Sequence, residues 1–136
     1  MVEISDIKKA YRFKTRPEWC PSGVPGMDGV EFLIAPNMRA LTKKYGELTR
    51  PFTRRGKTVI PADRANEINA KTIVGTIVLD WRGITEKGKS LPYSEDRAVD
   101  LFMATPAQVD DITEIAIEMS RTQETEDAEA DDNAKK

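Results

Sequence analysis

Residues 83–90 match the phosphate-binding loop pattern G-x-x-x-x-G-K-[ST] letter for letter. In nucleotide-binding proteins the backbone amides of such a loop cradle phosphates, the lysine contacts the terminal phosphates and the hydroxyl holds magnesium. That chemistry needs a helix beginning at the Lys-Ser pair, whereas Leu91 and Pro92 follow here, and proline lacks the required N–H. A tight polar turn is therefore the favoured interpretation, and nucleotide binding is the minor alternative.

Two pairs of adjacent carboxylates, Glu95 with Asp96 and Asp110 with Asp111, are the remaining candidates for acid–base catalysis. Neighbouring residues on a helix point in different directions, so we interpret both pairs as first-turn charges that favour the helix dipole. The single cysteine, Cys20, lies in a loop rich in proline and glycine, and the chain has no histidine to activate it. We therefore expect no enzyme, no cofactor and no metal site.

The 136-residue chain has a formal net charge of −2, but its charges are segregated along the sequence. Between residues 39 and 57 seven basic residues stand against Glu47 alone, a local balance of +6. Between residues 95 and 132 thirteen acids stand against Arg97 and Arg121, a balance of −11. The candidate protein-interaction surface comprises the basic residues Arg39, Lys43, Lys44, Arg50, Arg54, Arg55 and Lys57. A solvated face, a protein interface and a nucleic-acid contact all remain open for it, in that order of preference.

An N-terminal β-hairpin is expected over about residues 9–35. The segment 9–15 carries two aromatic residues in partial alternation, and the short apolar run 30–35 lies between Gly29 and Pro36. The intervening segment 16–29 holds three prolines and three glycines, which predicts a loop.

Apolar periodicity and capping residues predict helices over about 37–50, 61–81, 95–104 and 106–121. The second of these is ambiguous, because its β-branched run TIVGTIVL would also make a buried strand. A continuous apolar face between Ala65 and Trp81 favours the helix.

The expected fold is mainly α, with about four helices in a small bundle, the N-terminal β-hairpin and one globular domain over residues 1–121. Residues 122–136 contain six acids and no large apolar side chain, which predicts a disordered acidic tail. No stretch approaches 18 consecutive apolar residues, so we expect an intracellular protein without a membrane partner.

A string in the second half of the chain resembles the tail assembly chaperones of bacteriophages with long, non-contractile tails. It begins Asp80-Trp81-Arg82-Gly83 and, after a turn with Gly88 and Lys89, ends Leu91-Pro92-Tyr93-Ser94; the wider similarity covers about residues 9–120. We interpret its members as structural: the tryptophan closes one helix, the glycines form the turn, and the last residues begin the next helix. These motif residues are Trp81, Gly83, Gly88, Pro92, Tyr93 and Ser94.

The resemblance implies a chaperone that binds the tape measure protein, keeps it soluble and helps to recruit tail tube subunits through a longer, frameshifted form. It also implies a location in the host cytoplasm and absence from the mature virion. Residues 134–136, Ala-Lys-Lys, are compatible with a slippery message. The charge segregation separately predicts a homo-oligomer joined head to tail, as a ring or a spiral.

Two other classes of function remain open. A structural head–tail or minor tail protein would share the enzyme-free, oligomeric character. A nucleic-acid-binding protein would use the basic segment directly, with the acidic tail as an autoinhibitory element.

Overall fold

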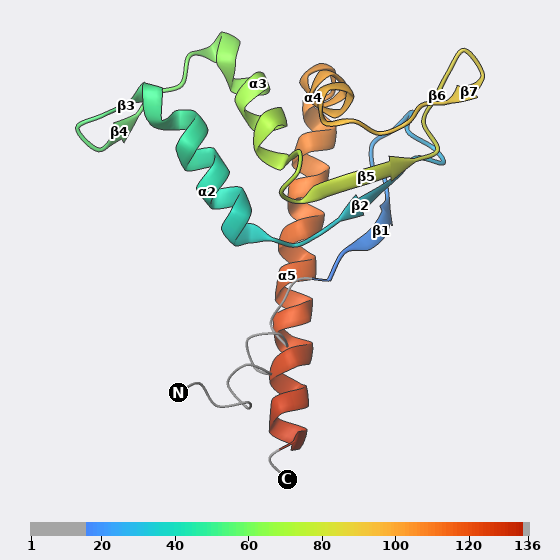
Figure 1. Cartoon of the computed structure of the whole chain (residues 1–136). Coiled ribbons are helices and arrows are strands. Elements are labelled where there is room, and N and C mark those ends of the chain that lie inside the picture. Colours follow the sequence, from blue (N-terminus) through green and yellow to red (C-terminus); the bar gives the residue numbers. More distant parts are fainter. Residues whose placement is uncertain (1–15, 135–136) are drawn as a thin grey trace.

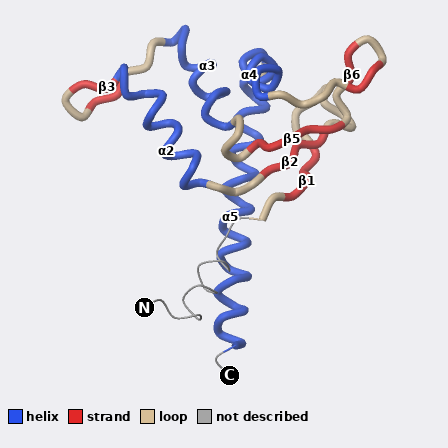
Figure 2. Tube along the Cα trace, viewed as in Figure 1, coloured by secondary structure: helices blue, strands red, loops and turns tan. Residues whose placement is uncertain are grey.

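The computed structural model describes residues 16–134, with side chains described through Glu126. Helices and short strands alternate along this part of the chain (Figures 1 and 2). The helices are α2 (Met38–Thr49), α3 (Ala62–Ile73), α4 (Glu95–Ala104) and α5 (Pro106–Ala134), and a 3₁₀ turn, η1 (Arg50–Phe52), follows α2. A three-stranded antiparallel sheet has the order β1 (Glu18–Pro21), β2 (Glu31–Ile34), β5 (Val78–Arg82). Two separate hairpins pair β3 (Thr53–Arg54) with β4 (Lys57–Thr58) and β6 (Thr85–Glu86) with β7 (Lys89–Ser90).

The fold is mixed α/β, so the predicted mainly α bundle is wrong. An N-terminal hairpin is present, in which Trp19 lies opposite Leu33 and Cys20 opposite Phe32. Its first strand lies inside the segment 16–29 that was expected to be a loop, while the predicted strand at 9–15 lies outside the described residues. The local pattern missed β1 because its pairing with β2, rather than any alternation of its own, holds it extended.

The predicted helix over 61–81 is also wrong in its second half. Helix α3 ends at Ile73, and Gly75 then takes a φ of +80°, a conformation that favours glycine. In β5 the side chains of Val78 and Trp81 are buried, while Leu79 is 39% exposed. The β-branched run therefore belongs to a strand, and the apolar face that favoured a helix is shared between the end of α3 and β5.

The hydrophobic core lies between the three-stranded sheet and helices α3, α4 and α5. Phe32 of β2 contacts Phe102 of α4, with ring centroids 5.6 Å apart. Ile34, Ile77 and Ile112 are fully buried in the same cluster. Burial of each large apolar side chain contributes about 1.5–3 kcal/mol, so this cluster holds the sheet against the helices.

Helix α5 continues well past residue 121, at which the predicted helix ended. Residues 122–134 are helical, which corrects the predicted disordered tail 122–136; residues 135–136 lie outside the described part. Gln123 explains part of this difference: its Oε1 accepts from the backbone N–H of Arg16 at 3.1 Å, and its Nε2 donates to the Arg16 carbonyl at 2.9 Å. In Figure 1 the helix projects beyond the sheet as a stalk, and its 29 residues span about 44 Å. Within the described residues, no helix combines the length and apolar character that a membrane crossing requires.

Candidate protein-interaction surfaces

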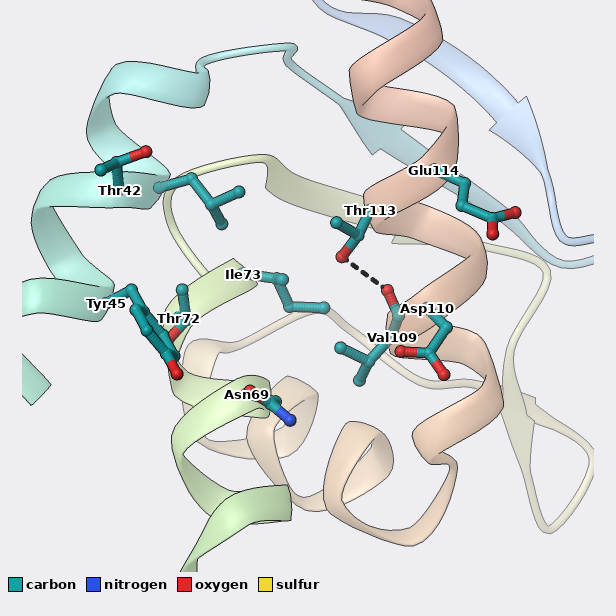
Figure 3. A pocket seen from close by; sticks show the side chains of 10 residues that line it. Thr42, Tyr45, Asn69, Thr72, Ile73, Val109, Asp110, Thr113 and Glu114 are labelled. Atoms are coloured by element: carbon teal, nitrogen blue, oxygen red, sulfur yellow. Dashed lines mark hydrogen bonds between the residues drawn. The ribbon is translucent and has the colours of Figure 1, made fainter. Parts of the chain in front are cut away.

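An open groove of about 540 Å³ lies between α2, α3 and α5 (Figure 3). Its lining comes from all three helices and from segments far apart in the sequence. Helix α2 contributes Leu41, Thr42 and Tyr45, helix α3 contributes Asn69, Thr72 and Ile73, and helix α5 contributes Val109, Asp110, Thr113 and Glu114.

The floor of the groove is largely apolar. Ile73 and Val109 reach it from the core, and Leu41 packs partly buried against the same core. The hydroxyl of Thr72 donates to the Ile68 carbonyl at 2.6 Å, and that of Thr113 donates to the Val109 carbonyl at 2.8 Å. Because these two hydroxyls are satisfied within their own helices, an apolar partner lying over the floor would not leave either of them unpaired.

The α5 rim of the groove is acidic. Asp110 and Glu114 are exposed one helical turn apart, and neither has an ion pair or a side-chain hydrogen bond to another described residue. The neighbouring Asp111 points elsewhere, where its carboxylate accepts from the backbone N–H of Gly23 at 3.0 Å. The two members of the Asp110/Asp111 pair therefore differ in the structure: Asp110 lines the groove, and Asp111 binds the backbone of the loop at Gly23.

The predicted basic surface extends along α2 and η1 to the tip of the β3–β4 hairpin, on the opposite side of the molecule from the β6–β7 hairpin (Figure 1). The spacing of the α2 residues along the sequence puts Arg39 and Lys43 on a different face of the helix from Leu41 and Tyr45. Within the described part of the chain, six of the seven basic residues are exposed and form no ion pair. These six are Arg39, Lys43, Arg50, Arg54, Arg55 and Lys57.

Lys44, the seventh, has a structural contact instead. Its side chain is half-buried, and Nζ donates to the carbonyl oxygen of Val74 at 2.5 Å. Val74 is the C-terminal cap of α3, where unpaired carbonyls favour a cation. Lys44 therefore fastens α2 to the end of α3 and is not available to the basic surface.

The phosphate-loop pattern forms the β6–β7 hairpin. Lys87 and Gly88 have φ values of 53° and 78°, so both central residues of the two-residue turn are left-handed. The next helix, α4, begins only at Glu95 and not at the Lys-Ser pair. The backbone here is folded as a hairpin and not as a strand–loop–helix phosphate cradle.

Trp81 lies in strand β5, so the prediction that it closes a helix is wrong. Together with Tyr93 it connects β5 to the segment that leads into α4. Their rings meet edge to face with centroids 5.1 Å apart. The indole Nε1 of Trp81 donates to the Leu91 carbonyl at 2.8 Å, and the Tyr93 hydroxyl donates to the Val78 carbonyl at 3.4 Å. Both aromatic residues therefore hold the connecting segment against the sheet.

The remaining motif residues shape the chain around this connection. Gly83 has a φ of +85°, and a Cβ placed there would lie 2.0 Å from the Gly29 carbonyl oxygen. The side chain of Ser94 caps α4 by accepting from the backbone N–H of Arg97 at 3.2 Å, and the Pro92 carbonyl accepts from the guanidinium of Arg97 at 3.0 Å. These contacts fix the path of the chain between β5 and α4, which supports a structural role for the motif residues.

Cys20 is a poor nucleophile in this setting. Burial raises the pKa of its thiol, and the carboxylates of Glu18 and Glu31 raise it further. The Sγ atom lies 3.8 Å from Met119 Sδ. Among the described residues no group of three or more histidine, cysteine, aspartate or glutamate side chains is arranged to hold a metal ion.

The basic residues could be recognised from the sequence, but the groove could not. The groove needs the relative placement of three helices, and α3 was predicted to continue where the structure turns into β5. The available signal was the periodic apolar face of α2, whose Leu41 and Tyr45 are only partly covered.

Residues 36–136 match the model of a family described as YdaY prophage protein. No curated protein matches, and no solved structure matches.

Proposed function

From the premise that the chain belongs to the YdaY prophage protein family, and is thus phage-derived, we propose that it is a tail assembly chaperone. In this role it binds the tape measure protein, keeps it soluble and helps to recruit tail tube subunits. The protein acts in the host cytoplasm and is left out of the mature virion. It performs no catalysis and needs no cofactor.

The groove between α2, α3 and α5 is the observation that supports this proposal best. A chaperone for a long apolar helix needs an open surface that is apolar at its centre and polar at its edges. The floor at Leu41, Ile73 and Val109 with the carboxylates of Asp110 and Glu114 beside it has that composition. A groove formed by three packed helices is also largely preformed, which lowers the entropic cost of binding.

The proposal includes self-association through the exposed basic surface. Six uncommitted cations on α2, η1 and the β3–β4 hairpin complement the acids of α4 and α5 on a second copy. Because the two surfaces differ, such contacts are heterologous and generate rings or open spirals. Repeated copies would allow one elongated partner to be coated along its length.

The direct test is co-expression with the tape measure protein of the same prophage. We expect the tape measure protein to stay in the soluble fraction and to co-purify with the native chain. Thr42→Arg places a long side chain at the exposed mouth of the groove and should reduce co-purification at least about tenfold, equivalent to roughly 1.4 kcal/mol.

Thr125→Arg is the matched control for this variant. Thr42 and Thr125 are both exposed helical threonines whose hydroxyls donate to the carbonyl four residues earlier at 2.9 Å, but Thr125 lies outside the groove. Equal effects of the two substitutions would contradict the groove as the binding site. Failure of the native chain to retain the tape measure protein would reject the function itself.

Two further measurements separate the proposal from its alternatives. Mass spectrometry of purified particles should find the tape measure protein but not this chain, whereas a structural head–tail or minor tail protein would be present. A nucleic-acid-binding protein would bind DNA in a salt-sensitive manner, and would bind more tightly after deletion of residues 122–136.

A further inference from the structure

We infer that the groove takes an amphipathic helix whose apolar face is flanked, on the side next to α5, by two basic residues one turn apart. This inference rests on the proposed function, because it specifies the chemistry of the segment that the chaperone binds. The distribution of charge around the groove supports it.

The two rims of the groove differ in charge. Along α5 the groove is lined by Asp110 and Glu114, and the Glu114 side chain extends outward from the helix (Figure 3). The α2 rim carries the uncharged Thr42 and Tyr45, the latter 38% exposed. The exposed cations of α2 lie on another face of that helix and do not line the groove. A bound helix therefore meets negative charge along one flank only.

The spacing of the carboxylates matches that of side chains on a docked helix. Asp110 and Glu114 are four residues apart on α5, a rise of about 6 Å along the helix axis. Lysine or arginine side chains at positions i and i+4 of a helix lying beside α5 have the same separation. Apolar residues at i, i+3, i+4 and i+7 of that helix would then face Leu41, Ile73 and Val109.

The native chain leaves these carboxylates uncompensated. Like charges at i and i+4 destabilise a helix modestly, and no cation of the described residues offsets Asp110 and Glu114. The adjacent Asp111, by contrast, is engaged with Gly23. A basic partner would relieve the repulsion, which gives the groove a preference for cationic flanks.

Two fluorescent model peptides test the inference with the full chain. Both are helical and carry leucine at i, i+3, i+4 and i+7; one has lysines and the other glutamates at the flanking positions one turn apart. Fluorescence anisotropy at low salt should show about three- to tenfold tighter binding of the lysine peptide, since each exposed charge pair contributes modestly. Asp110→Lys with Glu114→Lys should reverse that preference.

Glu47→Lys with Glu86→Lys is the matched control, because it makes the same change in net charge at exposed acids that lie outside both the groove and helices α4 and α5. The control should keep the native preference for the lysine peptide. Equal binding of the two peptides, or a preference that reversal of the groove acids leaves unchanged, would overturn the inference. It would also be overturned if that reversal dissociated copies of the chain without altering peptide binding, since the groove would then belong to a second copy.

The two proposals fail in different ways. If the lysine peptide binds in the predicted manner but the tape measure protein does not co-purify, only the proposed function is rejected. If the tape measure protein co-purifies equally with the native chain and with the Asp110→Lys, Glu114→Lys variant, only the inference about basic flanks is rejected.

Discussion

The hydroxyl of Tyr93 lies where the segment before α4 meets the sheet, 3.4 Å from the carbonyl oxygen of Val78. Burial raises the pKa of this hydroxyl to about 12, and the carboxylates of Glu95 and Asp80 add to the shift. All three causes disfavour the phenolate in the folded chain. The folded state therefore resists an ionisation that the unfolded state undergoes freely near pH 10.

At the residue scale we predict an alkaline loss of stability that depends on Tyr93. Below pH 10 the hydroxyl is protonated in both states, so it adds no pH dependence; above pH 10 the unfolded chain loses the proton first, and stability falls until about pH 12. Urea unfolding of Tyr93→Phe should show a smaller loss of unfolding free energy between pH 10 and 12 than the native chain. An identical pH dependence for the two chains would contradict the role of Tyr93.

Single residues were predictable from the sequence where their function is local. Ser94 caps the next helix through a contact only three residues away. The turn at Lys87 and Gly88 is equally local, because it depends on the left-handed conformation of two adjacent residues. Lys44 was placed in the basic surface because nothing in its neighbourhood reveals Val74, thirty residues further along the chain. Residues that act across the fold need tertiary information that spacing does not contain.

Secondary-structure elements show the same division between local and long-range causes. The N-caps of α2 and α4 are recognisable from Asn37 and Ser94, so the starts of these helices could be predicted. Strand β5 could not be predicted in this way, because it forms by pairing with β2, where Phe32 lies opposite Trp81, a residue far away in the sequence. The long-range ladder, with Gly75 in the turn before β5, decides between the two structures that the β-branched run allows.

At the element scale we predict that Lys44 stabilises the junction of α2 with the end of α3. Lys44→Met keeps most of the aliphatic stem but removes the charge-assisted hydrogen bond to Val74, which should lower the free energy of unfolding by about 1–3 kcal/mol. Lys43→Met, at an exposed position one residue earlier, should change it by less than about 0.5 kcal/mol. Urea denaturation measures both values, and equal effects would mean that the contact is not a fastening point.

On the scale of the whole molecule, the segregated charges lie on different elements: the basic segment forms α2, η1 and the β3–β4 hairpin, and the acidic segment forms α4 and α5. The two small hairpins project from opposite sides of the fold, and α5 extends away from both (Figure 1). Their sequences share the pattern T-x-[RK]-G-K-[ST], and both turns hold a long cation at a φ of 53°. The β3–β4 hairpin supplies three residues of the six-residue basic surface, Arg54, Arg55 and Lys57, whereas the β6–β7 hairpin lies away from that surface. The two hairpins therefore differ in their position and not in the sequence of their turns.

That difference allows a matched test of head-to-tail association. If the basic surface contacts the acids of a second copy, light scattering after size exclusion should show oligomers at low salt that dissociate at high salt, because exposed charge pairs are screened. Arg55→Glu with Lys57→Glu should shift the low-salt population to monomer, while Lys87→Glu with Lys89→Glu, at equivalent hairpin positions, should leave it assembled. A monomer at every salt concentration would remove self-association from the proposed function, and oligomers lost equally in both variants would show that net charge, not the basic surface, controls assembly.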